Sequence, residues 1–187
     1  MKPMKMEIDK RFRNSETGGY FEHCLVCHEN VLENEKDYFI EKIIRRIKSL
    51  NLTEVLFEYA ICMDCAQDMR KKISQHSMIQ METYFNQNAR LNERNSIDLK
   101  THQTTENCLF TGKPIPNCDE FSLHAHCEGK QMIVSIFPYA VSDDAMDAMS
   151  EILSAETMDE LDRFKKTHFN GPPELFELLS PKRLLPF

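Results

Sequence analysis

Cys24-Leu25-Val26-Cys27 and Cys62-Met63-Asp64-Cys65 are the two stretches of this 187-residue sequence that decide its fold. Each is a CxxC pair, in which two intervening residues allow a tight turn to point both sulfur atoms at one place. A structural zinc ion takes four ligands in a tetrahedron, so the two pairs together supply a complete set of thiolates. The sequence therefore predicts one structural Zn²⁺ bound by Cys24, Cys27, Cys62 and Cys65.

Three other chemistries use similar cysteine patterns. Residues 24–28 have the sequence CLVCH, which is the pattern of covalent c-type haem attachment, but that chemistry requires export and the N-terminal sequence carries no export signal. A thiol–disulfide active site would use one CxxC pair and leave the other without a role. Iron, in a rubredoxin-like centre or an iron–sulfur cluster, uses the same four thiolates. Zinc is the preferred interpretation, and iron stays open as an alternative.

The cysteine count also indicates the compartment. The chain has seven cysteines, and an odd number argues against a closed framework of disulfides. The N-terminal sequence lacks the apolar run of a signal peptide, and no stretch approaches the roughly 18 to 20 apolar residues of a membrane span. We therefore expect a cytoplasmic protein with reduced thiols and no membrane contact.

The charge is distributed unevenly along the chain. Residues 1–100 carry equal numbers of basic and acidic side chains, so the whole net charge of −7 lies in residues 101–187. An acidic half repels phosphate backbones, and the neutral half has no pattern of alternating basic and aromatic residues. Nucleic acid is thus a disfavoured partner, and we expect a protein partner instead.

The segment between the two cysteine pairs has two patterns. Apolar residues at helical spacing predict an amphipathic helix over residues 33–49. These apolar residues are Phe39, Ile40, Ile43, Ile44 and Ile47. Residues 52–61 are rich in β-branched and aromatic side chains, which predicts a strand that ends at Cys62.

Beyond Cys65 the chain lacks Gly and Pro, which predicts one long helix over residues 66–91. Its core-facing stripe is expected to consist of Ala66, Met69, Ile73, Tyr84 and Leu91, with His76 at the edge. Met78 and Phe85 point nearly the opposite way. They would need a second surface, such as the other half of the chain or a partner subunit.

A first cysteine pair, intervening structure, and a second pair on the first turn of a helix resemble the treble-clef class of zinc domains. The resemblance covers residues 23–91 and rests on the two CxxC pairs. It implies the fold and the metal but no particular task, because that class includes adaptors, nucleases and ribosomal proteins. The helix predicted over 33–49 departs from the hairpin that usually separates the two ligand pairs.

The second half of the chain has the pattern of an α+β unit. Strands over residues 121–127 and 130–139 are expected to form a hairpin through Glu128-Gly129. Ser142 is expected to cap a helix over 143–153, and Thr157 with Glu160 forms a capping box for a helix over 157–169. Gly171 and the prolines after it should stop that helix, and the apolar tail 174–187 should dock on the domain. No internal repeat is visible in the sequence.

A second group of potential metal ligands lies in this half: Cys108, Cys118, His124, His126 and Cys127. On a strand His124 and His126 share one face, where they could chelate a metal with a third ligand from Cys108 or Cys118. Cys127 falls on the opposite, apolar face as a small buried side chain. Ordinary burial of all these residues is the simpler interpretation.

The sequence therefore predicts an α+β protein in four parts. Residues 1–20 form a flexible N-terminal arm, 21–91 a small zinc-binding treble-clef-like domain, 92–107 a linker, and 108–187 an acidic half with a β-hairpin and C-terminal helices. A closed four-cysteine site has no open position for chemistry, so the leading hypothesis is a macromolecular binding or adaptor module. The alternatives are a metal-dependent hydrolase that uses His124 and His126, and a redox-sensing zinc–thiolate switch.

Overall fold

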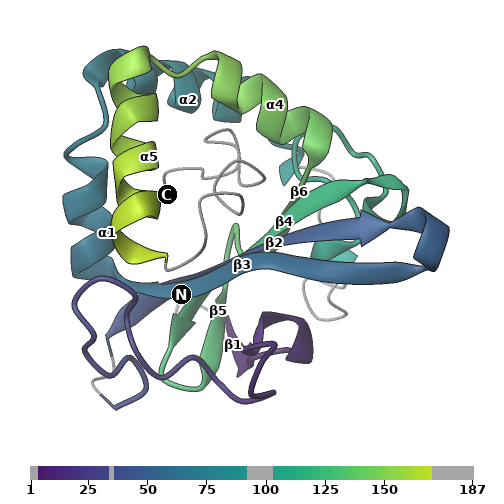
Figure 1. Ribbon diagram of the computed structural model, residues 1–187, viewed down its shortest axis with the longest axis vertical. Coiled ribbons are helices and arrows are strands. Elements are labelled where there is room, and N and C mark those ends of the chain that lie inside the picture. Colours follow the sequence, from purple (N-terminus) through teal and green to yellow (C-terminus); the bar gives the residue numbers. More distant parts are fainter. Residues whose placement is uncertain (1–3, 34–35, 92–102, 170–187) are drawn as a thin grey trace.

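The computed structural model describes residues 4–33, 36–91 and 103–169, which form a mixed α+β fold (Figure 1). Its six strands are β1 Met4–Glu7, β2 Asp37–Ile47, β3 Leu52–Cys62, β4 Glu120–Glu128, β5 Gln131–Val134 and β6 Tyr139–Ser142. They pair antiparallel in the order β1-β5-β4-β2-β3, and β6 pairs with β4 beside β5. The α+β class predicted from the sequence is confirmed.

Four α-helices accompany the sheet in the described part of the chain: α1 Met63–Arg70, α2 Gln75–Asn88, α4 Asp143–Glu151 and α5 Ala155–His168. Figure 1 shows them on one side of the long β2–β3 hairpin, with α1 beside α5 and the N-terminal segment on the other side. Short 3₁₀ turns at Lys10–Phe12, Lys48–Leu50, Gln103–Thr105 and Ile115–Asn117 connect the elements. None of the helices in the described residues has the length and apolar character needed to cross a bilayer.

The segment predicted as a helix over 33–49 is instead the strand β2, so that prediction is wrong. β2 lies in the middle of the sheet between β3 and β4. Its residues from Tyr38 to Ile43 are buried on both faces except for the half-buried Phe39. A strand buried on both sides shows no alternation of apolar and polar residues, and its apolar positions coincided by chance with helical spacing. The strand predicted over 52–61 is confirmed as β3.

The single helix predicted over 66–91 is two helices, α1 and α2. Ser74 has an extended backbone, and its side chain accepts a hydrogen bond from the Ser77 N–H, so it starts α2 as an N-cap. Ala66, Met69 and Ile73 are buried as expected, and Tyr84 and Leu91 pack against the core while half-buried. The stripe is therefore present on two helices rather than on one.

The predicted elements of the second half are mostly confirmed. β4 and β5 form the hairpin, and Gly129 adopts φ +53° in its turn, a conformation that favours glycine. Ser142 caps α4 as expected, since its hydroxyl accepts a hydrogen bond from the Ala145 N–H. The capping box is a correction, because Ser154 caps α5 and Thr157 lies buried in its first turn. The predicted helix stop at Gly171 and the docking tail 174–187 lie outside the described residues.

The sheet combines strands from three of the four predicted parts. β2 of the predicted zinc domain hydrogen-bonds to β4 of the acidic half along nine residue pairs. In the predicted arm, β1 pairs with β5 and Phe12 is fully buried, and the flexibility expected for residues 1–20 stays a prediction. Residues from both halves also share one hydrophobic core. Independent folding of residues 21–91 and 108–187 stays a prediction.

Candidate metal centre

The first cysteine pair lies in a tight turn that is tied to the sheet. The Cys24 N–H donates to the Glu29 carbonyl at 2.9 Å, and the His28 N–H donates back to the Cys24 carbonyl at 3.0 Å. His28 adopts φ +61°, which closes the turn. The Leu25 N–H donates to the Ala60 carbonyl at 2.8 Å. The turn is thereby held against the end of β3, which leads directly to the second pair.

The second cysteine pair lies where β3 passes into α1. Cys62 is the last residue of the strand and the N-cap of the helix, and Cys65 lies in the first helical turn. Thiolates at this position benefit from the positive end of the helix dipole. Hydrogen bonding along β2 and β3, which pair from Tyr38–Cys62 onwards, fixes the end of the strand in space.

The four sulfur atoms converge as a metal site requires. All four Sγ atoms lie within 4.8 Å of one another, and Cys27 Sγ is 3.8 Å from Cys62 Sγ. A tetrahedral zinc with Zn–S bonds of about 2.3 Å places its sulfur ligands about 3.8 Å apart. Cys24 and Cys62 are buried, Cys65 is half-buried, and only Cys27 of the four is exposed. The arrangement suits one metal ion bound by these cysteines, as the sequence predicted.

Backbone N–H groups also favour a thiolate at this centre. The N–H groups of Val26 and Cys62 each lie 3.4 Å from Cys24 Sγ. Burial acts to raise the pKa of the Cys24 thiol, but hydrogen bonds from the backbone of Cys27, Cys62 and Val26 outweigh burial and leave the pKa below its ordinary value. Burial is also the main cause that raises the pKa of Cys62 and Cys65. A bound cation would overcome that effect, because coordination to zinc deprotonates a thiol.

No family model, no curated protein and no solved structure is significantly similar to this chain. A function therefore has to be argued from the geometry of the molecule itself.

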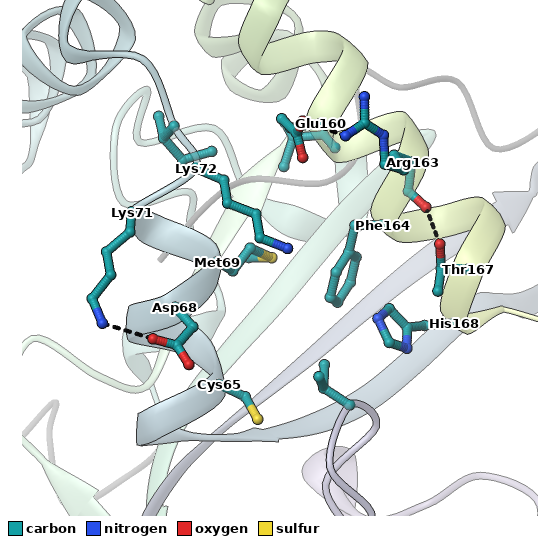
Figure 2. A pocket seen from close by; sticks show the side chains of 13 residues that line it. Cys65, Asp68, Met69, Lys71, Lys72, Glu160, Arg163, Phe164, Thr167 and His168 are labelled. Atoms are coloured by element: carbon teal, nitrogen blue, oxygen red, sulfur yellow. Dashed lines mark hydrogen bonds and ion pairs between the residues drawn. The ribbon is translucent and has the colours of Figure 1, made fainter.

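A pocket of about 540 Å³ opens next to the metal centre, between α1 and α5. Its apolar lining consists of Val26, Met69, Ile73, Leu161 and Phe164, and Cys65 contributes from the metal centre. Figure 2 shows Phe164 and His168 of α5 across the pocket from α1, with Cys65 near one end. This pocket could not be predicted from the sequence, because no local pattern brings α1 and α5 together.

Charged side chains surround the opening of this pocket. Lys71 pairs with Asp68 at 2.7 Å, and Arg163 pairs with Glu160 at 2.8 Å. Lys72 also lines the pocket, and the described residues give it no ion-pair partner. Burial, and then the nearby charges of His28 and Lys72, lowers the pKa of His168. An anionic group that entered the pocket would therefore meet Lys72.

The second cysteine–histidine group does not form a metal site in the described part of the chain. There, only the four cysteines of the first site bring three or more potential ligands together. His124 Nε2 lies 2.8 Å from the Ser122 hydroxyl, and His126 Nε2 lies 3.0 Å from the Asp37 carboxylate. The two histidines share one face of β4 as expected, but the hydrolase hypothesis finds no third ligand there.

The cysteines of this group are individually buried. Cys127 is fully buried, as the sequence predicted. Burial raises the pKa of Cys118 to about 11. Burial also acts to raise the pKa of Cys108, but hydrogen bonds from Ser142 and Thr111 outweigh it and lower that pKa. Cys108 therefore has hydrogen-bond partners, Thr111 and Ser142, of which Ser142 is distant in the sequence.

Proposed function

We propose that this protein binds one structural Zn²⁺ through Cys24, Cys27, Cys62 and Cys65 and acts as a cytoplasmic binding module for another protein. The single observation that carries the zinc proposal is the convergence of the four sulfur atoms within 4.8 Å. None of the seven cysteines, all of which lie in the described residues, is in a disulfide, which supports a reducing compartment. Four cysteines occupy all positions of a tetrahedral ion, so the metal would stabilise the fold and would not act on a substrate.

The elements around the centre support a treble-clef-like zinc domain. A turn carries the first ligand pair, the β2–β3 hairpin follows, and the first turn of α1 carries the second pair. The hairpin replaces the helix that the sequence predicted between the ligand pairs. That correction strengthens the resemblance, because a hairpin is the usual connection in the class.

The pocket between α1 and α5 supports a role in binding protein. Its apolar lining could receive one apolar side chain, and the surrounding charges could fix the orientation of a bound segment. Lys72 is positioned to pair with a carboxylate beside that side chain. We therefore propose a partner segment that carries an apolar residue next to an acidic one.

Elemental analysis of the purified, reduced protein tests the metal. Plasma mass spectrometry should report about one zinc per chain and no iron. An absence of zinc after folding in zinc-containing, reducing buffer would refute the proposed centre. One iron in place of zinc would keep the four-cysteine site and change its chemistry.

Three variants test the binding role. Proteins cross-linked to the tagged chain in its native cells are compared for wild type, Lys72→Glu, Phe164→Ala and the control Lys10→Glu. Lys10 is exposed and does not line the pocket. We expect one specific protein to be captured by wild type and the control and lost with both pocket variants. The same set of proteins from all four samples would contradict the proposed role of the pocket.

A further inference from the structure

The structure contains the same succession of elements twice. A turn that starts with cysteine, an antiparallel strand pair and two helices occur first as residues 24–29, β2, β3, α1 and α2. They recur as residues 108–113, β4, β6, α4 and α5, with the short β5 inserted. We infer that residues 108–169 are a second copy of the zinc-binding unit, with a vestigial metal site at Cys108, Thr111, Ser142 and Ala145. This inference rests on the proposed zinc centre in the first copy.

The strand pairs match residue by residue. The last four residues of β3 pair with β2 as Tyr38–Cys62, Phe39–Ile61, Ile40–Ala60 and Glu41–Tyr59. The four residues of β6 pair with β4 as Phe121–Ser142, Ser122–Val141, Leu123–Ala140 and His124–Tyr139. In the strand order β3-β2-β4-β6, the antiparallel neighbours β2 and β4 lie at the centre, and their equivalent partners β3 and β6 lie outside them. The order is therefore unchanged when the two copies are exchanged. A two-fold axis through the sheet between β2 and β4 would therefore exchange the two copies.

The helices of the two copies also correspond, in the positions of their N-caps and in length. Their N-caps Ser74 and Ser154 are separated by 80 positions. α2 and α5 each contain 14 residues, and both end 14 positions after their cap. Cys62 caps α1, and Ser142, at the same spacing from Cys62, caps α4. Identical residues at this spacing include Tyr59 and Tyr139, Ala60 and Ala140, Asp64 and Asp144, Met69 and Met149, and Met78 and Met158.

Reciprocal hydrogen bonds mark the axis where the helices meet. The Ser74 N–H donates to Thr157 Oγ1 at 3.1 Å, and the Ser154 N–H donates to Ser77 Oγ at 2.8 Å. Exchange of the two copies converts each of these bonds into the other. The hydroxyls of Ser74 and Ser154 lie 2.8 Å apart. A symmetric contact of this kind is expected at a two-fold axis.

The two turns have the same hydrogen bonds as well. In the second turn the Cys108 N–H donates to the Lys113 carbonyl at 2.9 Å, and the Gly112 N–H donates to the Cys108 carbonyl at 3.0 Å. Gly112 adopts φ +71° where His28 has φ +61° in the first turn. The Leu109 N–H donates to the Ala140 carbonyl at 2.8 Å, as Leu25 does to Ala60 in the first copy. The second turn therefore docks on β6 as the first docks on β3.

These correspondences assign the four ligand positions in the second copy. The structurally equivalent residues are Cys108 and Cys24, Thr111 and Cys27, Ser142 and Cys62, and Ala145 and Cys65. The Thr111 and Ser142 hydroxyls are 3.2 Å apart, and the Thr111 N–H lies 3.5 Å from Cys108 Sγ. Cys108, Ser142 and Ala145 are buried. Hydrogen bonds here connect the turn to the start of α4, where the first copy would use a metal ion.

Restoration of the missing thiols tests the inference. The variant Thr111→Cys/Ser142→Cys/Ala145→Cys should bind two zinc ions per chain where wild type binds one. Cobalt substitution should double the thiolate-to-cobalt absorption. The matched control adds Cys108→Ser to the three cysteines and should return the zinc content towards one. A folded triple variant that still holds one zinc would overturn the inference.

A double variant decides the matter if the triple variant does not fold. The double variant Thr111→Cys/Ser142→Cys keeps Ala145 in the first turn of α4 and gives three thiolates with Cys108, with a cysteine at the N-cap of α4 as Cys62 stands at the N-cap of α1. Cobalt absorption above that of wild type would support the inference, and its absence would overturn it. The zinc content of wild type tests the first centre separately, because the inference concerns only the difference between variant and wild type.

Discussion

Cys27 and Cys62 hold their sulfur atoms 3.8 Å apart, although 35 positions separate them in the chain. The contact connects the first turn to the start of α1, and the whole β2–β3 hairpin lies between the two cysteines. A zinc ion at this point would close a long loop and constrain the unfolded chain, in addition to the energy of its bonds. The stability of the fold should therefore depend on the metal.

Cys62→Ser should lose the zinc and most of the stability that the metal provides. We expect the zinc content to fall from about one per chain to near zero and the melting temperature to fall by on the order of 10 °C. Inductively coupled plasma analysis and differential scanning calorimetry measure the two effects. Hydrogen exchange should increase first in α1, which contains Cys65.

Cys118→Ser is the matched control for this prediction. Cys118 is also fully buried, and its sulfur lies 3.6 Å from the Pro114 carbonyl, a contact that a serine hydroxyl could make. The control should keep its zinc. Equal losses of stability in both variants, with zinc retained in Cys62→Ser, would contradict a structural metal at the four cysteines.

The metal centre was predictable because its information is local. Each CxxC pair is a turn of four residues, and turns of this kind are determined by short-range geometry. That the two pairs converge could be inferred only from the four ligands that zinc requires. The sequence could not show how the end of β3 contacts the turn at Cys24–Cys27. The hydrogen bond from Leu25 to Ala60 provides that connection in the structure.

The central strand was missed for a physical reason. Ile40 and Ile43 are both buried although they face opposite sides of the sheet, so β2 lacks the alternation that identifies a strand with one exposed face. Its richness in β-branched residues was the one signal that favoured a strand over a helix. The break between α1 and α2 was missed because Ser74 can either continue or cap a helix.

The repeat was also missed, because three of the four ligand positions differ between the copies. Thr111, Ser142 and Ala145 are not residue types that indicate a zinc site. Among the four ligand positions, only that of Cys108 is a cysteine in both copies. Ser74 and Ser154 cap equivalent helices in the two copies and were a usable signal of the repeat. Serine is common in helix caps, however, so the match did not stand out. The relationship becomes visible only through the register of the strands.

The stability of the protein should fall in acid because of His124. His124 is buried beside Tyr139, whose ring stacks on it at 4.8 Å, and burial lowers its pKa to about 3. The unfolded chain binds a proton there below about pH 6.5, whereas the folded chain does not until about pH 3. The unfolded state thus holds more protons, so the free energy of unfolding should decrease by up to about 1.4 kcal/mol per pH unit as the pH falls through this window.

Urea unfolding between pH 7 and pH 4 measures this effect. His124→Gln keeps a hydrogen-bonding group near Ser122 and should show a shallower dependence on pH than wild type. His76→Gln is the control, because His76 is exposed on α2. Identical pH slopes for wild type and His124→Gln would refute the role of His124.

Lys42 and Glu58 form a buried ion pair that should be costly to break. The Lys42 Nζ lies 2.7 Å from the Glu58 carboxylate and 2.6 Å from the Arg13 carbonyl, and both side chains of the pair are at most 10% exposed. Glu58→Leu alone leaves a buried ammonium group and should cost about 3 to 5 kcal/mol in the free energy of unfolding.

The double variant Lys42→Met/Glu58→Leu should be more stable than Glu58→Leu alone, because it removes the uncompensated charge. Chemical denaturation measures both changes. The exposed pair of Asp68 and Lys71 provides a control, and Asp68→Ala should change stability little. A double variant that is less stable than Glu58→Leu would show that the pair is not the dominant interaction there.

Ser74 and Ser154 should be energetically coupled, since each caps its own helix and also contacts the other helix. Their hydroxyls are 2.8 Å apart, and Ser74 also hydrogen-bonds to the first turn of α5. Removal of either hydroxyl should cost about 1 to 2 kcal/mol, because it removes a cap and disturbs its partner. The double variant Ser74→Ala/Ser154→Ala should therefore lose less than the sum of the single variants, by about 0.5 to 1 kcal/mol. Additive losses would show two independent helix caps, and the helix contact would then contribute nothing beyond them.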